Sequence, residues 1–191
     1  MIKIGLTGVI GSGKTTAVNH FKSLGVPVFI ADDSAKKLMT YDEDLKSEII
    51  DLLGENAYLG LELNKEFISE RIFNNKDLLI SINNLVHPKV NNIYSKWLEE
   101  QRFAYSIYEA ALIFENESES YFDKIICIKT PLDIIHSRLK YRPNYSKNKI
   151  NLILKNQINQ DIKCSKSDFC IDNISIDELR EQINRIHFNF K

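Results

Sequence analysis

The chain has 191 residues, a formal net charge of -1 and 43% apolar residues, the composition of an ordinary globular protein. A chain of this length can bury one α/β core and an insertion but hardly two independent domains, so we expect one domain over residues 1–191. The sequence contains no apolar run long enough to cross a bilayer, and it begins with a predicted strand rather than a signal peptide. We therefore expect a cytoplasmic protein, with neither a membrane nor a nucleic acid as partner.

The first predicted strand, residues 2–7, leads into a glycine-rich run with the sequence GVIGSGKT at residues 8–15. This run fits the pattern G-x-x-x-x-G-K-[ST] at every position, and a predicted helix over residues 16–24 follows it and ends at Gly25. Strand, glycine loop and helix form the context in which this pattern binds a nucleoside triphosphate. The complete match and both flanking elements argue against a chance glycine-rich turn.

Each residue type in this loop suits phosphate binding for a separate reason. Glycines allow the backbone to point successive N–H groups at a phosphate, and the N-terminus of the following helix adds partial positive charge. Lys14 supplies a mobile charge for the β- and γ-phosphates, and the Thr15 hydroxyl is placed to ligate Mg²⁺. We therefore expect ATP and Mg²⁺ as ligands. The loop residues expected to bind them are Gly11, Ser12, Gly13, Lys14, Thr15 and Thr16.

Asp32 stands just beyond a second predicted strand, residues 26–31. Ligands of open α/β sheets bind at the carboxyl ends of the strands. We expect this strand to lie next in strand order to the phosphate-binding loop, so Asp32 is our candidate for the catalytic base or for a residue that organises Mg²⁺. The alternative is that Asp32 simply caps the following helix, a role that we assign to the adjacent Asp33.

A helical insertion is predicted from residue 34 to residue 101, because helical spacing of apolar residues has no competing strand pattern there. We expect Pro88 to kink or divide the longest helix of this segment near His87. Asp51-Leu52-Leu53-Gly54 matches the D-x-x-G of a switch loop, but Gly54 is better explained as the C-cap of a helix. A regulatory GTPase would also need the sequence N-K-x-D, which does not occur.

Strands resume after the insertion and alternate with helices to the end of the chain. Predicted strands cover residues 103–112, 124–129 and 168–172, and predicted helices run from Pro131 to Tyr141, from about 147 to 160, and after the capping box Ser175-x-x-Glu178. Alternating strands and helices predict a parallel, five-stranded sheet covered on both faces. The fold class is therefore α/β, a three-layer P-loop NTPase sandwich with a helical insertion.

The segment from His136 to Ser167 is strongly basic, with Asp161 as its one acid. In a protein that binds polyphosphate, such a one-sided run is better read as an anion-facing element than as a solvated helical face. The basic residues are Arg138, Lys140, Arg142, Lys147, Lys149, Lys155, Lys163 and Lys166. The three cysteines, Cys127, Cys164 and Cys170, form no metal-binding pattern, and we expect all of them to be reduced.

The ordered set of motifs resembles the dephospho-coenzyme A kinase family over nearly the whole chain. The motifs that carry the resemblance are LTGVIGSGKTT at residues 6–16, Ala31-Asp32 with Ala35, His87-Pro88, Leu112-Ile113-Phe114-Glu115, Arg138 with Arg142, Gln157, and SDFCIDN at residues 167–173. The resemblance implies transfer of a phosphoryl group from ATP to the ribose 3′-hydroxyl of dephospho-CoA. The rivals are a kinase for another nucleotide or nucleoside, and a nucleotide-dependent switch.

The resemblance also implies roles for single residues. Residues 138–163 resemble the lid region of the family, which closes over ATP, and the lid can bend at Pro143-Asn144. Within this region, Arg142, with Arg138 and Lys163, resembles the residues that stabilise charge on the transferring phosphoryl group. His87 and Glu115 are weaker candidates for binding the acceptor. The sequence departs from the family at Ile30, Ala111 and Lys163, where an acid, a proline and an arginine are usual. We expect a monomer or a weak homo-oligomer.

Overall fold

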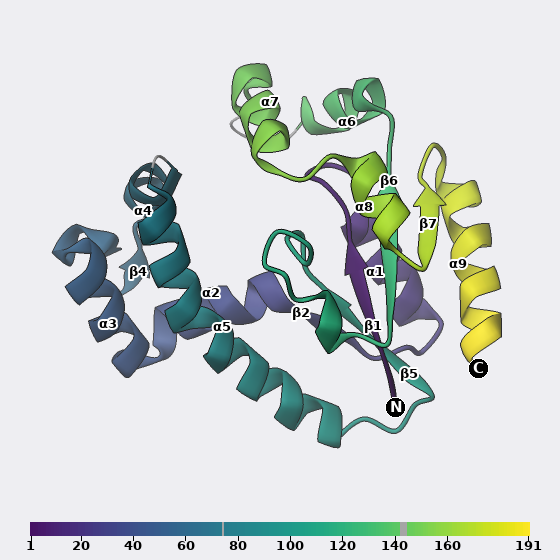
Figure 1. The fold of residues 1–191 in the computed structure, drawn as a ribbon, viewed down its shortest axis with the longest axis horizontal. Coiled ribbons are helices and arrows are strands. Elements are labelled where there is room, and N and C mark those ends of the chain that lie inside the picture. Colours follow the sequence, from purple (N-terminus) through teal and green to yellow (C-terminus); the bar gives the residue numbers. More distant parts are fainter. Residues whose placement is uncertain (74, 142–144) are drawn as a thin grey trace. The chain divides into compact units, whose positions relative to one another are not determined.

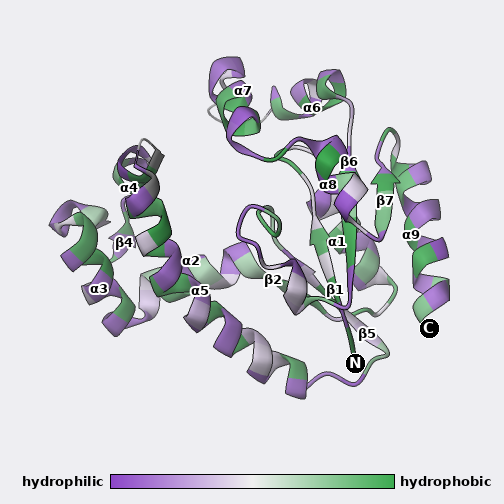
Figure 2. Cartoon of the chain, in the orientation of Figure 1, coloured by the Kyte–Doolittle hydropathy of each residue, from purple (hydrophilic) through white to green (hydrophobic). Residues whose placement is uncertain are grey.

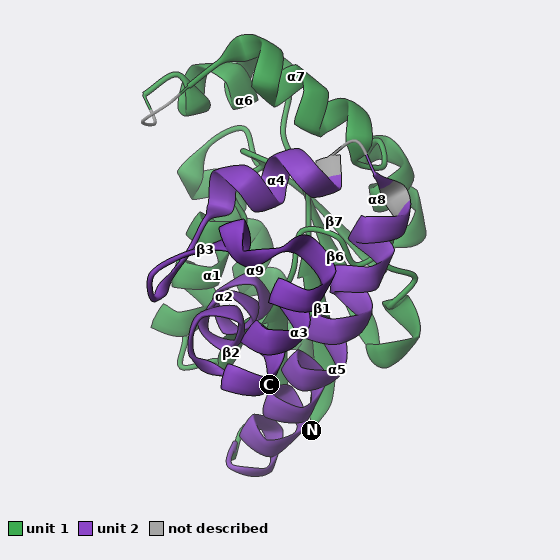
Figure 3. Ribbon diagram, turned by 90° about the vertical axis from the view of Figure 1, so that its left-hand side faces the viewer, with its two compact units in different colours: residues 1–30, 102–191 green, residues 31–101 purple. Residues whose placement is uncertain are grey.

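The computed structural model describes residues 1–73, 75–141 and 145–191. The chain forms two compact units, one made of residues 1–30 and 102–191 and the other of residues 31–101 (Figure 3). The second unit begins slightly before the predicted insertion and ends at the same residue. That both units act as one kinase domain stays a prediction.

The first unit contains a sheet of five parallel strands in the order β2-β5-β1-β6-β7 (Figure 1). The strands are β1 (Ile2–Thr7), β2 (Val28–Ile30), β5 (Tyr105–Glu109), β6 (Lys124–Lys129) and β7 (Phe169–Asp172). The parallel five-stranded sheet predicted from the alternation of elements is thus confirmed, although β2 and β5 are shorter than expected. Since all five strands run the same way, their carboxyl ends meet at one edge.

The sheet is buried on both faces because apolar side chains alternate across its strands. On one face, Ile4 and Leu6 of β1 pack with residues of two helices, including Phe21 and Leu179. On the other face, Ile125 of β6 packs in a separate cluster. The helices of this unit are α1 (Lys14–Ser23), α6 (Leu132–Leu139), α7 (Lys147–Asn156), α8 (Gln160–Lys166) and α9 (Ile176–Phe190), with a short 3-10 turn at η2 (Glu119–Tyr121).

Capping side chains explain where several of these helices begin. The Ser175 hydroxyl accepts the backbone N–H of Glu178 and starts α9, as predicted, and α9 alternates polar and apolar residues along its length (Figure 2). The single helix predicted over residues 147–160 is wrong. The backbone of Gln157 is extended, with a φ of -91° and a ψ of 149°, so α7 ends at Asn156. The side chain of Asn159 then accepts the backbone N–H of Asp161 at 2.7 Å and starts α8 as a separate helix.

The order of strands corrects the position that we expected for the second strand. Although β2 follows β1 in sequence, β5 lies between them in the sheet. A parallel strand formed after a long insertion can pair with β1 as easily as the strand nearest in sequence can. The carboxylate at the end of β5, Glu109, therefore lies on the strand beside the phosphate-binding loop, and Asp32 follows the strand beyond it.

The second unit is mainly helical. It consists of α2 (Ala31–Tyr41), α3 (Glu43–Leu53), η1 (Glu55–Ala57), a small antiparallel pair β3 (Tyr58–Leu59) and β4 (Glu62–Leu63), α4 (Lys65–Phe73) and α5 (Lys76–Glu99). Gly54 ends α3 with a φ of 92°, as its reading as a C-cap predicted. The strand pair was missed. Because α2 begins at Ala31, Asp32 and Asp33 both lie in its first turn, and Asp33 is not a cap.

Pro88 does not divide the longest helix, because α5 runs without a break through it. A proline removes one backbone hydrogen bond of a helix. Its neighbours in α5 offset this loss by burying a stripe at helical spacing, made of Ile82, Val86, Val90 and Tyr94. Packing of this stripe against α2, α3 and α4 thus holds the helix together.

Candidate active site

The phosphate-binding loop joins β1 to α1 and depends on glycine at its end. Gly13, the N-cap of α1, has a φ of 94°, a left-handed conformation that glycine adopts readily. A Cβ atom at this position would lie 2.0 Å from Nδ2 of Asn173. Among the described residues, no side chain caps α1. The first-turn N–H groups of this helix are therefore suited to an anion.

Two buried side chains from neighbouring strand ends fix the shape of the loop. The backbone oxygen of Ser12 accepts Nδ2–H of Asn173 at 2.7 Å and the Thr130 hydroxyl at 2.8 Å. Thr130 follows β6 and Asn173 follows β7, and both residues are almost fully buried. Because buried hydrogen bonds are shielded from water, this pair holds the loop against the carboxyl edge of the sheet.

Lys14 reaches back across the loop. Its Nζ donates to the backbone oxygen of Gly8 at 2.9 Å and lies 4.0 Å from Oε1 of Glu109. The side chains of Lys14 and Glu109 are only 13% and 11% exposed, so their charges interact more strongly than surface charges do. Sequence reasoning missed Glu109. Its signal was a single acid near the end of an apolar strand, and only the strand order places it beside Lys14.

Thr15 and Thr16 follow Lys14 in the first turn of α1, and both threonines are exposed residues. The described part of the chain contains no group of three or more His, Cys, Asp or Glu residues that could hold a metal ion. The hydroxyl oxygen of Thr15 fits Mg²⁺, because kinases hold this ion with one or two protein oxygens together with substrate phosphates and water.

Arg138 and Arg142 are the two arginines expected to bind ATP, and Arg138 is the one that lies among the described residues. Arg138 of α6 donates through Nη2 to the backbone oxygens of Asn173 and Ile174, at 3.3 and 3.2 Å. It therefore lies beside the residue that holds the phosphate-binding loop. Arg142 and the predicted bend at residues 143–144 lie outside the described residues.

Lys163 and Glu115 form a largely buried ion pair with a distance of 2.8 Å from Nζ to Oε1. Lys163 is fully buried and also donates to the backbone oxygen of Ala111 at 2.8 Å, while Glu115 accepts the N–H of Ile158 at 2.9 Å. These contacts give both residues a structural role in the first unit. Acceptor binding by Glu115 and a lid role for Lys163 stay predictions.

Asp32 and His87 belong to the second unit. Asp32 is exposed in the first turn of α2, directly after β2 in the chain. His87 lies within α5, and burial lowers its pKa below the ordinary value, so the neutral imidazole is favoured. Catalysis by Asp32 and acceptor binding by His87 stay predictions.

Two of the three cysteines are not reduced, contrary to expectation. Cys164 at the end of α8 and Cys170 in β7 form a disulfide with a Cα–Cα distance of 5.2 Å. The helix that places Cys164 beside β7 was not predicted as a separate element, which explains the error. Cys127 is free, and burial raises the pKa of its thiol to about 11.

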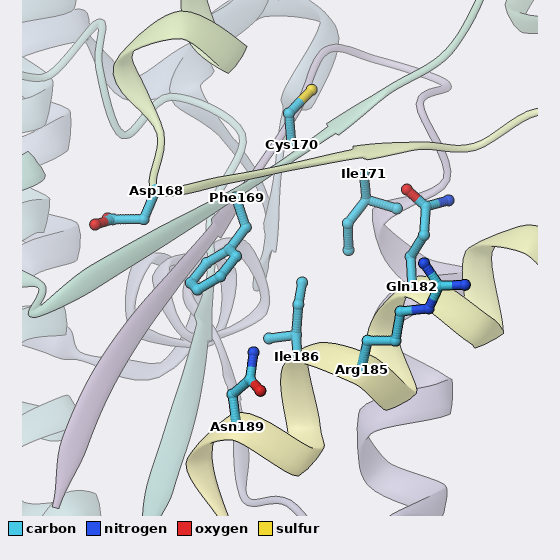
Figure 4. A pocket seen from close by; sticks show the side chains of 8 residues that line it. All are labelled: Asp168, Phe169, Cys170, Ile171, Gln182, Arg185, Ile186 and Asn189. Carbon is cyan, nitrogen blue, oxygen red and sulfur yellow. The ribbon is translucent and has the colours of Figure 1, made fainter.

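A pocket of about 340 Å³ lies between β7 and α9 (Figure 4). Phe169 and Ile171 line it together with Gln182 and Arg185, while the sulfur of Cys170 points away from these two apolar side chains. None of its lining residues belongs to the phosphate-binding loop, so this pocket is not the nucleotide site.

No described helix has both the length and the apolar character that a membrane span requires.

Comparisons with known proteins agree with the loop and the fold. A model of the family described as dephospho-CoA kinase matches residues 2–178. A dephospho-CoA kinase of Bacteroides fragilis is 31% identical over 183 residues, which cover 95% of this chain and 89% of that protein. The solved structure of dephospho-CoA kinase from Campylobacter jejuni is 25% identical, with a TM-score of 0.68, and the match covers 98% of this chain and 96% of that one. A solved structure from Thermus thermophilus shares the fold with a TM-score of 0.90 at 24% identity, over 98% and 96% of the two chains.

Proposed function

The chain belongs to the dephospho-CoA kinase family, and on this premise we propose how its residues transfer the γ-phosphoryl group of ATP to the ribose 3′-hydroxyl of dephospho-CoA, giving CoA and ADP. The observation that carries the proposal is the intact phosphate-binding loop, with Lys14 reaching across it and Ser12 held by two strand ends. The match to the family along nearly the whole chain supports the acceptor.

The loop binds the β- and γ-phosphates through backbone N–H groups at Gly11 and Gly13 and at the start of α1, while the N–H of Ser12 holds the turn by donating to the Val9 oxygen. Lys14 exchanges its contact with the Gly8 oxygen for the phosphates, so its charge offsets the charge that spreads over the transferring group. Arg138 lies beside the loop and, with Arg142, adds positive charge and planar guanidinium groups that can grip phosphate oxygens in pairs.

Mg²⁺ would be bound with ATP, held by the Thr15 hydroxyl and, if Asp32 organises the ion rather than acts as the base, by Asp32 as well. When bound, the ion neutralises phosphate charge and orients the γ-phosphoryl group. If Asp32 acts instead as the base, it accepts the proton of the 3′-hydroxyl as that oxygen attacks phosphorus in line with the leaving ADP oxygen. Glu109 keeps the ammonium of Lys14 close to the loop by its charge.

The second unit, which contains His87, holds the acceptor with its 3′-hydroxyl oriented for attack. We place the reaction in the cytoplasm and treat the enzyme as a monomer or weak homo-oligomer. Both substrates are small molecules, so the proposed reaction requires no macromolecular partner.

The proposed activity is tested by mixing the protein with ATP, Mg²⁺ and dephospho-CoA and following ADP together with the mass of the CoA product. We expect ADP to form only when dephospho-CoA is present, one CoA for each ADP. Lys14→Ala should abolish product while leaving the fold intact, because Lys14 contributes charge rather than core packing. Slow ATP hydrolysis that ignores the acceptor would support the nucleotide-dependent switch instead.

A further inference from the structure

Gln157 connects the basic helix α7 to the phosphate-binding loop. It is the first residue after α7, and its Oε1 accepts the backbone N–H of Ile10 at 3.0 Å. Ile10 belongs to the loop but is not a glycine. Its N–H group is engaged by Gln157, and the N–H of Ser12 donates to the Val9 oxygen at 3.1 Å, so the loop presents the N–H groups of Gly11 and Gly13 for phosphate.

The apolar side chains of the loop strengthen this connection. Val9 is buried in a cluster with Ile135 of α6 and Ile150 of α7, and Ile10 and Leu154 pack against the same cluster. Val9 and Ile10, which lie between Gly8 and Gly11 in the loop, thus pack in one small apolar cluster with residues of α6 and α7. A movement of α7 would therefore displace Val9 and Ile10, because tightly packed interiors transmit displacements.

The residues just after Gln157 are hydrogen-bonded to residues that follow strands β5 and β6, and these bonds restrict the side-chain amide of Gln157. The N–H of Ile158 donates to Glu115 at 2.9 Å, and Oε1 of Gln160 accepts the N–H of Thr130 at 3.1 Å. Thr130 in turn donates to the Ser12 oxygen. Since its neighbours are fixed, Gln157 holds its acceptor oxygen in place before ATP arrives, and little ordering entropy is lost on binding.

We propose that Gln157 is a positioning residue for phosphoryl transfer. By holding the peptide group between Val9 and Ile10, it keeps the following N–H groups of the loop turned toward ATP and links their orientation to the position of α7. Its role rests on the kinase function proposed above. The two can fail separately, since turnover by the wild-type enzyme tests the function and the comparison of variants tests Gln157.

The test uses the full chain with Gln157→Met, which keeps the size of the side chain but removes the acceptor, and Gln157→Glu, which keeps an acceptor oxygen. Gln182→Met is the matched control, because Oε1 of Gln182 also accepts a backbone N–H, that of Asp172, outside the loop. Three quantities are measured for each protein: steady-state KM and kcat with ATP and dephospho-CoA, the melting temperature, and hydrogen exchange of the Ile10 amide.

We expect Gln157→Met to raise KM for ATP about 3- to 10-fold, the equivalent of one hydrogen bond, with KM for dephospho-CoA unchanged. The Ile10 amide should exchange faster in Gln157→Met, but should stay protected in Gln157→Glu and Gln182→Met. The proposal is overturned if KM for ATP stays within twofold of wild type, if Gln182→Met has the same effect, or if Ile10 exchanges equally fast in the Met and Glu variants. If Gln157→Met does not fold, exchange at Ile10 in Gln157→Glu decides, and lost protection there also overturns it.

Discussion

Replacing Gly13 with alanine tests how closely the phosphate-binding loop is fitted to its supports. Gly13 has a φ of 94°, and a Cβ atom there would lie 2.0 Å from Nδ2 of Asn173. Non-bonded heavy atoms separate to about 3.5 Å, so the loop or the Asn173 amide must move by more than about 1 Å. The hydrogen bond from Asn173 to the Ser12 oxygen lies in the path of that movement.

The magnitude follows from two contributions. A left-handed conformation costs an L-residue about 1–2 kcal/mol. Loss of a partner for the Asn173 amide, which is 2% exposed, costs about 1–3 kcal/mol more. We therefore expect Gly13→Ala to lower the free energy of unfolding by about 2–5 kcal/mol. Displacement of the loop by about 1 Å should lower kcat/KM for ATP by roughly 10²-fold.

Gly25 at the other end of α1 supplies the matched control. Its φ is 80°, and a Cβ atom there would meet nothing closer than Phe103 at 4.0 Å, an ordinary contact. Gly25→Ala should therefore lose only the backbone contribution, about 1–2 kcal/mol, with normal turnover. Denaturant unfolding and steady-state kinetics measure both variants. If Gly13→Ala is as stable and as active as Gly25→Ala, the loop is not held by Asn173 in the way described.

Three further predictions concern other residues. Asp32→Asn should lower kcat by roughly 10²-fold with little change in KM for ATP; recovery in excess Mg²⁺ would show that Asp32 organises the metal rather than acts as base. Lys163→Met should lower the free energy of unfolding by about 3 kcal/mol, since it leaves the largely buried Glu115 without its ion-pair partner, and adding Glu115→Gln should restore part of the loss; no recovery would mean that the ion pair is not the cause. Cys127 should resist alkylation in the native protein at pH 8, because its thiol has a pKa raised to about 11; rapid labelling would contradict its burial.

The phosphate-binding loop could be predicted from sequence because its function depends on local backbone geometry. Residues 8–15 must provide turns, N–H donors and a lysine within one short segment, so the pattern contains most of the information. The cap of α9 at Ser175 was predictable for the same reason. Both features depend on residues that are neighbours in the chain.

Features that depend on long-range pairing were not predicted. Glu109 lies beside Lys14 only because β5 pairs with β1 after a long insertion, and nothing local to Glu109 encodes that pairing. The disulfide between Cys164 and Cys170 likewise depends on how α8 packs beside β7. Pro88 shows the converse, since its local helix-breaking tendency is outweighed by packing along α5.

The measurement that tests the central claim most directly is kcat/KM for three acceptors, dephospho-CoA, AMP and adenosine, with ATP and Mg²⁺. Contacts to the pyrophosphate and pantetheine parts of dephospho-CoA can help to align the reacting hydroxyl, and the smaller acceptors lack those parts wholly or in large measure. We predict that dephospho-CoA is used far better than the other two. Equal or better use of AMP or adenosine would contradict the assignment and identify a kinase for another nucleotide or nucleoside.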